Sequence, residues 1–186
     1  MSGEHDEVDD ALTYLEADVY EFRSGYERAR VARRLSHSSM DAAQRARARR
    51  YVLDVVEGRK HCTQPALGRL AHAVADNPTR AALRARLLST DTEVARRAMR
   101  TLSFVRHPSL NEDERERARG LVLADAGRTS WVTPSVRRLA RWLWAPEWEA
   151  ALRELARHHG PDRAAAKKLI EDRDRRREHR ARRPSP

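Results

Sequence analysis

The placement of proline constrains the fold of this chain more than any other feature of its sequence. Five of the eight prolines, Pro65, Pro78, Pro134, Pro146 and Pro161, stand where a helix would begin. Proline suits the first turn of a helix, because its missing N–H group would have no intrahelical partner there. The prolines therefore predict a series of short helices with tight connections.

Capping residues add to this pattern. Asn77 and Thr133 are good N-caps, Asp41 places an acid in the first turn of another helix, and Gly58 is a typical C-terminal stop. We expect helices near residues 8–36, 40–57, 64–75, 78–88, 91–105, 111–125, 134–144, 146–158 and 161–180.

Composition favours an all-α fold. Only 12 Val, 1 Ile and 8 Thr occur among 186 residues, too few for a sheet protein. Large aliphatic residues are also scarce, so disorder is an alternative. The helical periodicity favours an ordered chain, either a short irregular helical-repeat solenoid or a helical bundle.

Charge divides the chain into three parts. The net charge is +10, but residues 1–22 contain eight acids and no Lys or Arg, whereas residues 162–186 contain ten bases and five acids. Such asymmetry suggests ends with opposite electrostatic roles. We expect an acidic N-terminal segment with a helical hairpin (1–62), a helical-repeat region (63–160) and a basic C-terminal helix or tail (161–186).

An apolar seam runs along the first expected helix. Its members alternate three and four residues apart, and Gly25 could bend or break the helix between them. The seam favours packing within the chain over a dimeric coiled coil, and it leaves the oligomeric state open. It consists of Leu12, Leu15, Val19, Phe22, Tyr26 and Ala29.

Two later helices share an apolar pattern. Val94, Ala98 and Leu102 lie on one helical face, and the same positions are apolar 42 residues later. This spacing lies within the range of about 40 to 47 residues typical of HEAT and armadillo repeats. Through DTEVARRAMRTL (91–102) and PSVRRLARWLW (134–144), residues 64–158 resemble the HEAT-like family. The resemblance implies a scaffold of helix pairs that binds proteins or nucleic acids along one surface, with no chemistry of its own.

Helical projection places basic side chains opposite the apolar stripe of both helices. If the helices stack as neighbouring repeats, Arg96 lies beside Arg138 and Arg100 beside Trp142. Such a ridge could hold phosphates and stack a base. The expected ridge consists of Arg96, Arg97, Arg100, Arg138, Arg141 and Trp142.

An ordinary solvated face is the alternative to this ridge. Trp142 would then pack on the next helix or on Trp148, and the arginines would pair with Glu93 and Glu149.

The C-terminal segment DRDRRREHRARRPSP has no apolar stripe. As a charged helix or a disordered tail it would bind polyanions without specificity, and a purely solubilising tail is the alternative. Its expected contacts are Arg173, Arg175, Arg176, Arg177, Arg180, Arg182 and Arg183.

Motifs for chemistry are absent from the sequence. Cys62 is the only cysteine, which excludes an internal disulfide, and His61 and His158–His159 lack the spacing of zinc ligands. No GxxxxGK[ST], GxGxxG or GxSxG motif occurs, so we expect no catalytic residue, metal or cofactor. A lesser alternative is an enzyme resembling the DNA-alkylation glycosylases, with Asp125, Arg128 and Trp131 close in sequence.

These patterns predict a non-enzymatic binding module for an acidic partner, foremost nucleic acid or a ribonucleoprotein. A protein-interaction adaptor with incidental basic charge is the alternative. No stretch of the sequence has the length and hydropathy of a membrane span or a signal peptide, so we expect no membrane partner and a cytoplasmic location.

Overall fold

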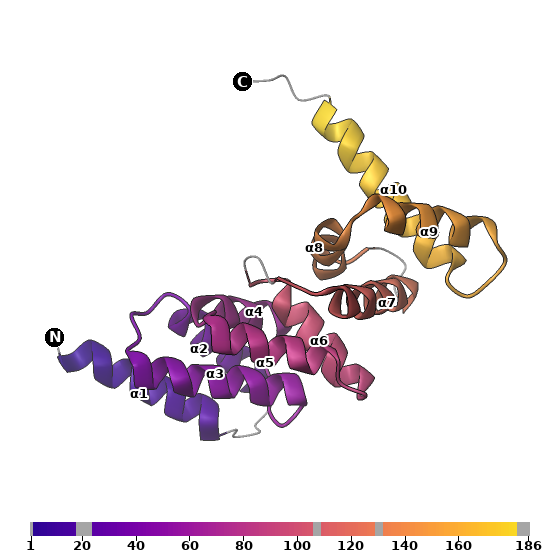
Figure 1. Cartoon of the computed structure of the whole chain (residues 1–186). Helices are drawn as coiled ribbons and strands as arrows, with labels where there is room; N and C mark the ends of the chain where they lie inside the picture. Colours follow the sequence, from indigo (N-terminus) through magenta and orange to yellow (C-terminus); the bar gives the residue numbers. More distant parts are fainter. Residues whose placement is uncertain (1, 18–23, 106–108, 129–131, 182–186) are drawn as a thin grey trace. The chain divides into compact units, whose positions relative to one another are not determined.

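The computed structural model describes residues 2–17, 24–105, 109–128 and 132–181. These residues form ten helices and no strand, which confirms the all-α prediction. The chain divides into two compact units, residues 1–110 and residues 111–186 (Figure 1). We call them the first and the second unit.

The first unit is a bundle of helices in which α1 lies along α3 and α2 packs on α4 (Figure 1). The pair α5 and α6 completes it, and α6 also contacts α3 and α4. Leu12, Leu67, Leu83 and Leu102 are among its fully buried side chains. Its helices are α1 (Ser2–Ala17), α2 (Ser24–Leu35), α3 (Ala42–Glu57), α4 (Gln64–Ala73), α5 (Asn77–Leu87) and α6 (Thr92–Leu102).

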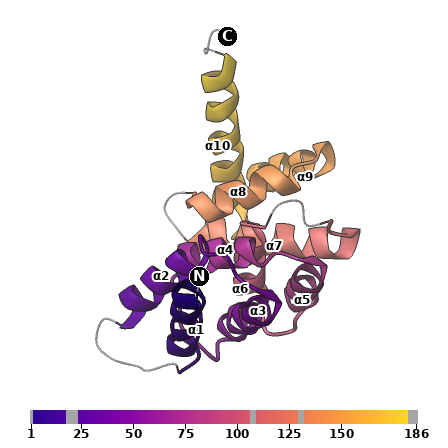
Figure 2. The same ribbon diagram turned by 90° about the vertical axis from the view of Figure 1, so that its left-hand side faces the viewer.

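The second unit is built on α10, which packs against α9 and α7 and touches α8. The C-terminal turns of α10 extend beyond the other helices of this unit in both ribbon views (Figures 1 and 2). Its helices are α7 (Glu112–Arg128), α8 (Pro134–Leu143), α9 (Pro146–Arg157) and α10 (Arg163–Ala181).

Local signals place most helix ends. Pro65, Pro78, Pro134 and Pro146 occupy the first two positions of α4, α5, α8 and α9, as predicted. Asp41 and Gln44 form a capping box at α3, and Gly58 ends that helix with φ +81°. Ends of this kind depend on neighbours in sequence, which is why a sequence pattern can locate them.

The expected first helix is instead two helices, α1 and α2, separated by residues 18–23, which lie outside the described part of the chain. Its seam is confirmed at Leu12, Leu15 and Ala29, which are buried. Tyr26 is 81% exposed, so its place in the seam is wrong. The expected positions of Val19 and Phe22 lie outside the described residues.

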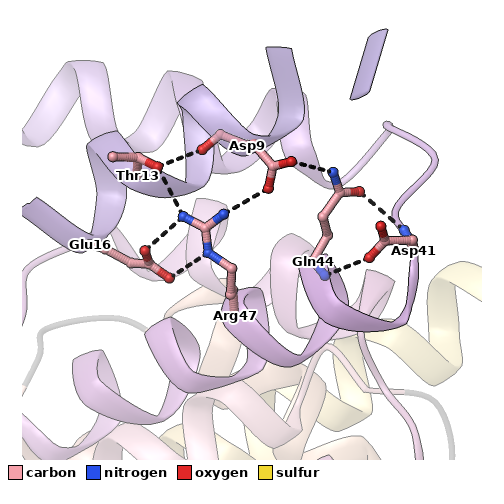
Figure 3. A network of polar contacts seen from close by, with 6 residues as sticks. All are labelled: Asp9, Thr13, Glu16, Asp41, Gln44 and Arg47. Atoms are coloured by element: carbon pink, nitrogen blue, oxygen red, sulfur yellow. Dashed lines mark hydrogen bonds and ion pairs between the residues drawn. The ribbon is translucent and has the colours of Figure 1, made fainter. Parts of the chain in front are cut away.

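The acids of α1 contact bases of the same unit (Figure 3). The guanidinium of Arg47 on α3 donates to Asp9 at 2.7 Å, to Thr13 at 2.9 Å and to both oxygens of Glu16 at 2.8 and 3.0 Å. Arg34 on α2 forms an ion pair with Glu7. The buried apolar face and these ion pairs together hold α1 on the first unit.

The division into units differs from the three segments expected from charge. It falls between Leu110 and Asn111, because α4 and α6 pack on α2 and α3, and α10 packs on α7 and α9. Tertiary packing of this kind leaves no mark in the charge pattern. No helix among the described residues combines the length and hydropathy needed to cross a bilayer.

Candidate functional site

Arginines from two helices of the second unit gather around one tryptophan. Arg141 comes from the last turn of α8, and Arg173, Arg176 and Arg177 come from α10. Together with Trp144 they line a pocket of about 220 Å³. A concave surface lined by four guanidinium groups is suited to an anionic ligand.

Trp144 is held in place by the connection between α8 and α9. Thr133 and Pro134 start α8, and Pro146 starts α9, so Trp144 adopts an extended conformation between the two helices. Its ring meets Trp148 edge to face, with ring centroids 5.3 Å apart and an interplanar angle of 63°. The Arg173 guanidinium lies 4.3 Å from the Trp144 ring centroid, a cation–π contact.

A single carboxylate, Glu149, holds this arrangement in place. Glu149 accepts a hydrogen bond from Trp144 Nε1 at 3.2 Å and one from Arg153 at 2.8 Å. It also forms an ion pair with Arg173. Three donors on one half-buried carboxylate set the positions of Trp144 and Arg173 before any ligand arrives.

The site carries an excess of positive charge. Burial lowers the pKa of Arg173, and the like charges of Arg177 and Arg176 lower it further. Arginine stays charged at neutral pH, so the crowding persists as repulsion among the guanidinium groups. An anion bound between them would relieve that repulsion.

Two of the four arginines have no acidic partner within the described part of the chain. Arg176 pairs with Asp172 at 3.0 Å, and Asp172 also pairs with Arg137 at 2.9 Å. Arg141 and Arg177 are exposed, and neither forms an ion pair with a described residue. Their charges are the ones available to a ligand.

A second pocket along α10 has a mixed lining. It has a volume of about 520 Å³, and its lining includes the bases Arg137, Lys168, Arg175 and Arg176 and the acids Glu171 and Asp172. Arg176 lines both pockets, so the two pockets meet at this residue, but the second is not purely basic.

The second unit therefore contains many of the predicted contacts, and the pocket beside Trp144 brings Arg141, Arg173, Arg176 and Arg177 together. Arg138, Arg141 and Trp142 are exposed on α8, Trp142 to 37%. We call the following set the α8–α10 surface: Arg138, Arg141, Trp142, Trp144, Arg173, Arg175, Arg176 and Arg177. The side chain of Arg180 and all of Arg182 and Arg183 lie outside what the structure describes.

The three predicted contacts on α6 take other positions. Arg96 was expected to face solvent, but it is only 2% exposed and pairs with Glu93. Arg97 donates to the carbonyl of Val56 at 2.7 Å, at the end of α3, and Arg100 is half-buried. The projection fails here because α3, α4 and α5 all pack on α6, which buries more than one face.

The proposed stacking of repeats stays a prediction. The two helices that carry it, α6 and α8, belong to different units. Of the residues considered for a glycosylase-like enzyme, Asp125 is buried within α7, Arg128 is exposed at its end, and Trp131 lies outside the described residues.

Sequence reasoning missed the role of Trp144 and expected Glu149 only as an ion-pair partner of arginines on a solvated face. The helical projection assigned Trp144 to the buried stripe of α8, whereas the structure places it half-buried at the pocket. The signal lay in the segment WAPEWE (144–149), where a proline separates two tryptophans and an acid follows the second.

Comparison with known proteins gives no family assignment. No family model, no curated protein and no solved structure matches this chain. The chemistry of the site is therefore the guide to its function.

Proposed function

We propose that the second unit is a binding module for nucleic acid and that the α8–α10 surface holds the phosphate backbone. The observation that carries this proposal is the pair Arg141 and Arg177, which are exposed beside a pocket and free of acidic partners among the described residues. An arginine guanidinium can donate two parallel hydrogen bonds to a phosphate, and the binding free energy is larger when no carboxylate competes for the guanidinium.

Arg173 and Arg176 play a different part in this proposal. Each already pairs with a carboxylate, Glu149 or Asp172, and each is half-buried. These ion pairs orient the two guanidinium groups toward the pocket, so a phosphate would meet donors already in place.

Single-stranded nucleic acid fits the surface better than a duplex. Trp142 is 37% exposed on α8, the helix that also carries Arg138 and Arg141. An exposed indole next to phosphate contacts can stack on an unpaired base, which a duplex does not offer. Trp144 is less suited to stacking, because Arg173 covers its ring.

The adaptor alternative rests on the apolar seam and the acids of the N-terminal segment. Leu12 and Leu15 of this seam are buried within the first unit, and its acids pair with Arg47 and Arg34. These contacts favour the nucleic-acid proposal over the adaptor.

Binding of a labelled single-stranded oligonucleotide to the full chain, followed by fluorescence anisotropy, tests the proposal. Arg141→Gln combined with Arg177→Gln should weaken binding roughly tenfold at moderate salt, because two phosphate contacts are lost. The matched control is Arg115→Gln with Arg157→Gln, which removes the same charge from exposed positions of the same unit. An equal loss in both double variants would show that net charge alone attracts the oligonucleotide.

A second variant tests the preference for single strands. Trp142→Ala should weaken single-stranded binding by about 1 to 3 kcal/mol and leave duplex binding nearly unchanged. Equal weakening of both would contradict stacking by Trp142.

A further inference from the structure

The first unit contains a pocket that the proposed function does not use. It has a volume of about 680 Å³ and is lined by Ser36, His37, Arg69, His72 and Phe104. These residues come from the end of α2, from α4 and from the segment that follows α6. The volume lies within the range of about 300 to 1,000 Å³ that is usual for small-molecule sites.

One wall of this pocket is an aromatic ring seated on a helix backbone. A Cβ atom added to Gly68 of α4 would lie 2.2 Å from Phe104 Cδ2, closer than real Cβ atoms approach. Glycine at this position therefore allows the Phe104 ring to lie directly against α4. The ring is half-buried and lines the pocket, where it offers an apolar surface.

Apart from Phe104, the side chains that line the pocket are polar or cationic. Arg69 and His72 lie three residues apart on α4 and so share a face, and His37 follows the end of α2. All three are exposed, and none has a side-chain partner among the residues that the structure describes. No acid occurs among the described lining residues.

Ser36 adds an acceptor rather than a free donor. Its hydroxyl donates to the carbonyl of Arg33 at 2.7 Å, so only the lone pairs of the hydroxyl oxygen are left to accept a hydrogen bond. The pocket thus combines one aromatic wall, one guanidinium, two imidazoles and one hydroxyl oxygen.

We infer that this pocket binds a small planar aromatic molecule that carries an acidic group. The Arg69 guanidinium can take a carboxylate or a phosphate in a forked pair of hydrogen bonds, and the imidazole N–H groups can donate to the same anion. The Phe104 ring supplies the apolar contact for the aromatic part of the ligand. The site is separate from the α8–α10 surface and uses residues of the first unit alone.

Calorimetric titration of the full chain with three probes tests this inference. The probes are 2-naphthoate, 1-naphthyl phosphate and the uncharged 2-naphthalenemethanol. Both anions should bind at least about fivefold more tightly than the alcohol, because only they pair with the guanidinium. If 2-naphthoate and 1-naphthyl phosphate bind equally, the site recognises negative charge. If one of them binds more tightly, its acidic group is the one that the natural ligand carries.

Variants identify the pocket as the place of binding. Arg69→Gln should weaken 2-naphthoate roughly tenfold and leave the alcohol unchanged. Arg45→Gln is the matched control, an exposed arginine of the first unit outside the pocket. Phe104→Leu should weaken all three probes, and its circular dichroism spectrum shows whether the unit stays folded.

Several results would overturn the inference. These are no binding of either anion at millimolar concentration, equal affinity for anion and alcohol, or the same loss with Arg45→Gln as with Arg69→Gln. Oligonucleotide affinity separates this inference from the proposed function, because Arg69→Gln should leave it unchanged.

Discussion

Replacement of Arg47 measures how far charge, rather than apolar burial, holds α1 on the first unit. The Arg47 side chain is 27% exposed and its acidic partners Asp9 and Glu16 are 52% and 34% exposed. Exposed ion pairs contribute about 0.2 to 1 kcal/mol each, and a shared guanidinium adds to this only modestly. Arg47→Gln should therefore lower the free energy that holds α1 on the first unit by about 1 to 2 kcal/mol.

Apolar burial should contribute more than charge to the same contact. Leu15 is fully buried, and Leu15→Ala should cost about 2 to 5 kcal/mol through lost contacts and the cavity left behind. Leu15→Ala should therefore destabilise the contact of α1 more than Arg47→Gln does.

Backbone hydrogen exchange of α1 is the assay. A loss of about 1.4 kcal/mol corresponds to a tenfold change in the opening equilibrium, so Arg47→Gln should speed the exchange of protected α1 amides roughly tenfold. Arg45→Gln, an exposed arginine on α3 with no partner among the described residues, is the control. All four tryptophans lie after residue 130, so tryptophan fluorescence should stay unchanged in both variants.

Two outcomes would refute this reasoning. Complete loss of protection in Arg47→Gln would show that ion pairs alone dock α1. An equal effect of Arg45→Gln would show that the protein responds to net charge rather than to the contacts in Figure 3.

Further predictions use other parts of the chain. Acid should loosen the docking of α1, because the hydrogen bond from Arg47 lowers the pKa of Glu16 below 4.5. The stabilisation that Glu16 contributes is complete above pH 4.5 and is lost as the pH falls through the lower folded-state pKa. Amide exchange of α1 between about pH 5 and 3 can follow this loss. Ala98→Glu should unfold the first unit by burying an unpaired charge, with a large loss of helical circular dichroism; a variant that melts like the parent would contradict the face assignment. Burial raises the pKa of the Cys62 thiol, so alkylation by iodoacetamide should be much slower than in unfolded protein. Glu149→Gln should free the tryptophans around it, with a red shift of their emission, and an unchanged spectrum would count against its positioning role.

Local features of this fold could be predicted from the sequence. Proline at the starts of α4, α5, α8 and α9 and Gly58 at the end of α3 act through neighbouring backbone groups. The pattern of these residues is therefore enough to locate the helices.

Features that depend on tertiary packing could not be predicted in this way. Arg96 is buried because other helices pack around α6. The projection of a single helix does not include the helices that pack against it. Trp144 likewise gains its role from Glu149 and Arg173, the second of which lies 29 residues further along the chain. The sequence shows many arginines, but only the fold shows which of them are already paired.

The salt dependence of oligonucleotide binding tests the central claim most directly. For single strands, log K falls with log salt by about 0.7 for each phosphate contact. Removal of Arg141 and Arg177 together should therefore lower the slope by about 1.4, while Arg115→Gln with Arg157→Gln leaves it unchanged. A slope that stays the same without Arg141 and Arg177, or falls equally in the control, would contradict phosphate binding at the α8–α10 surface.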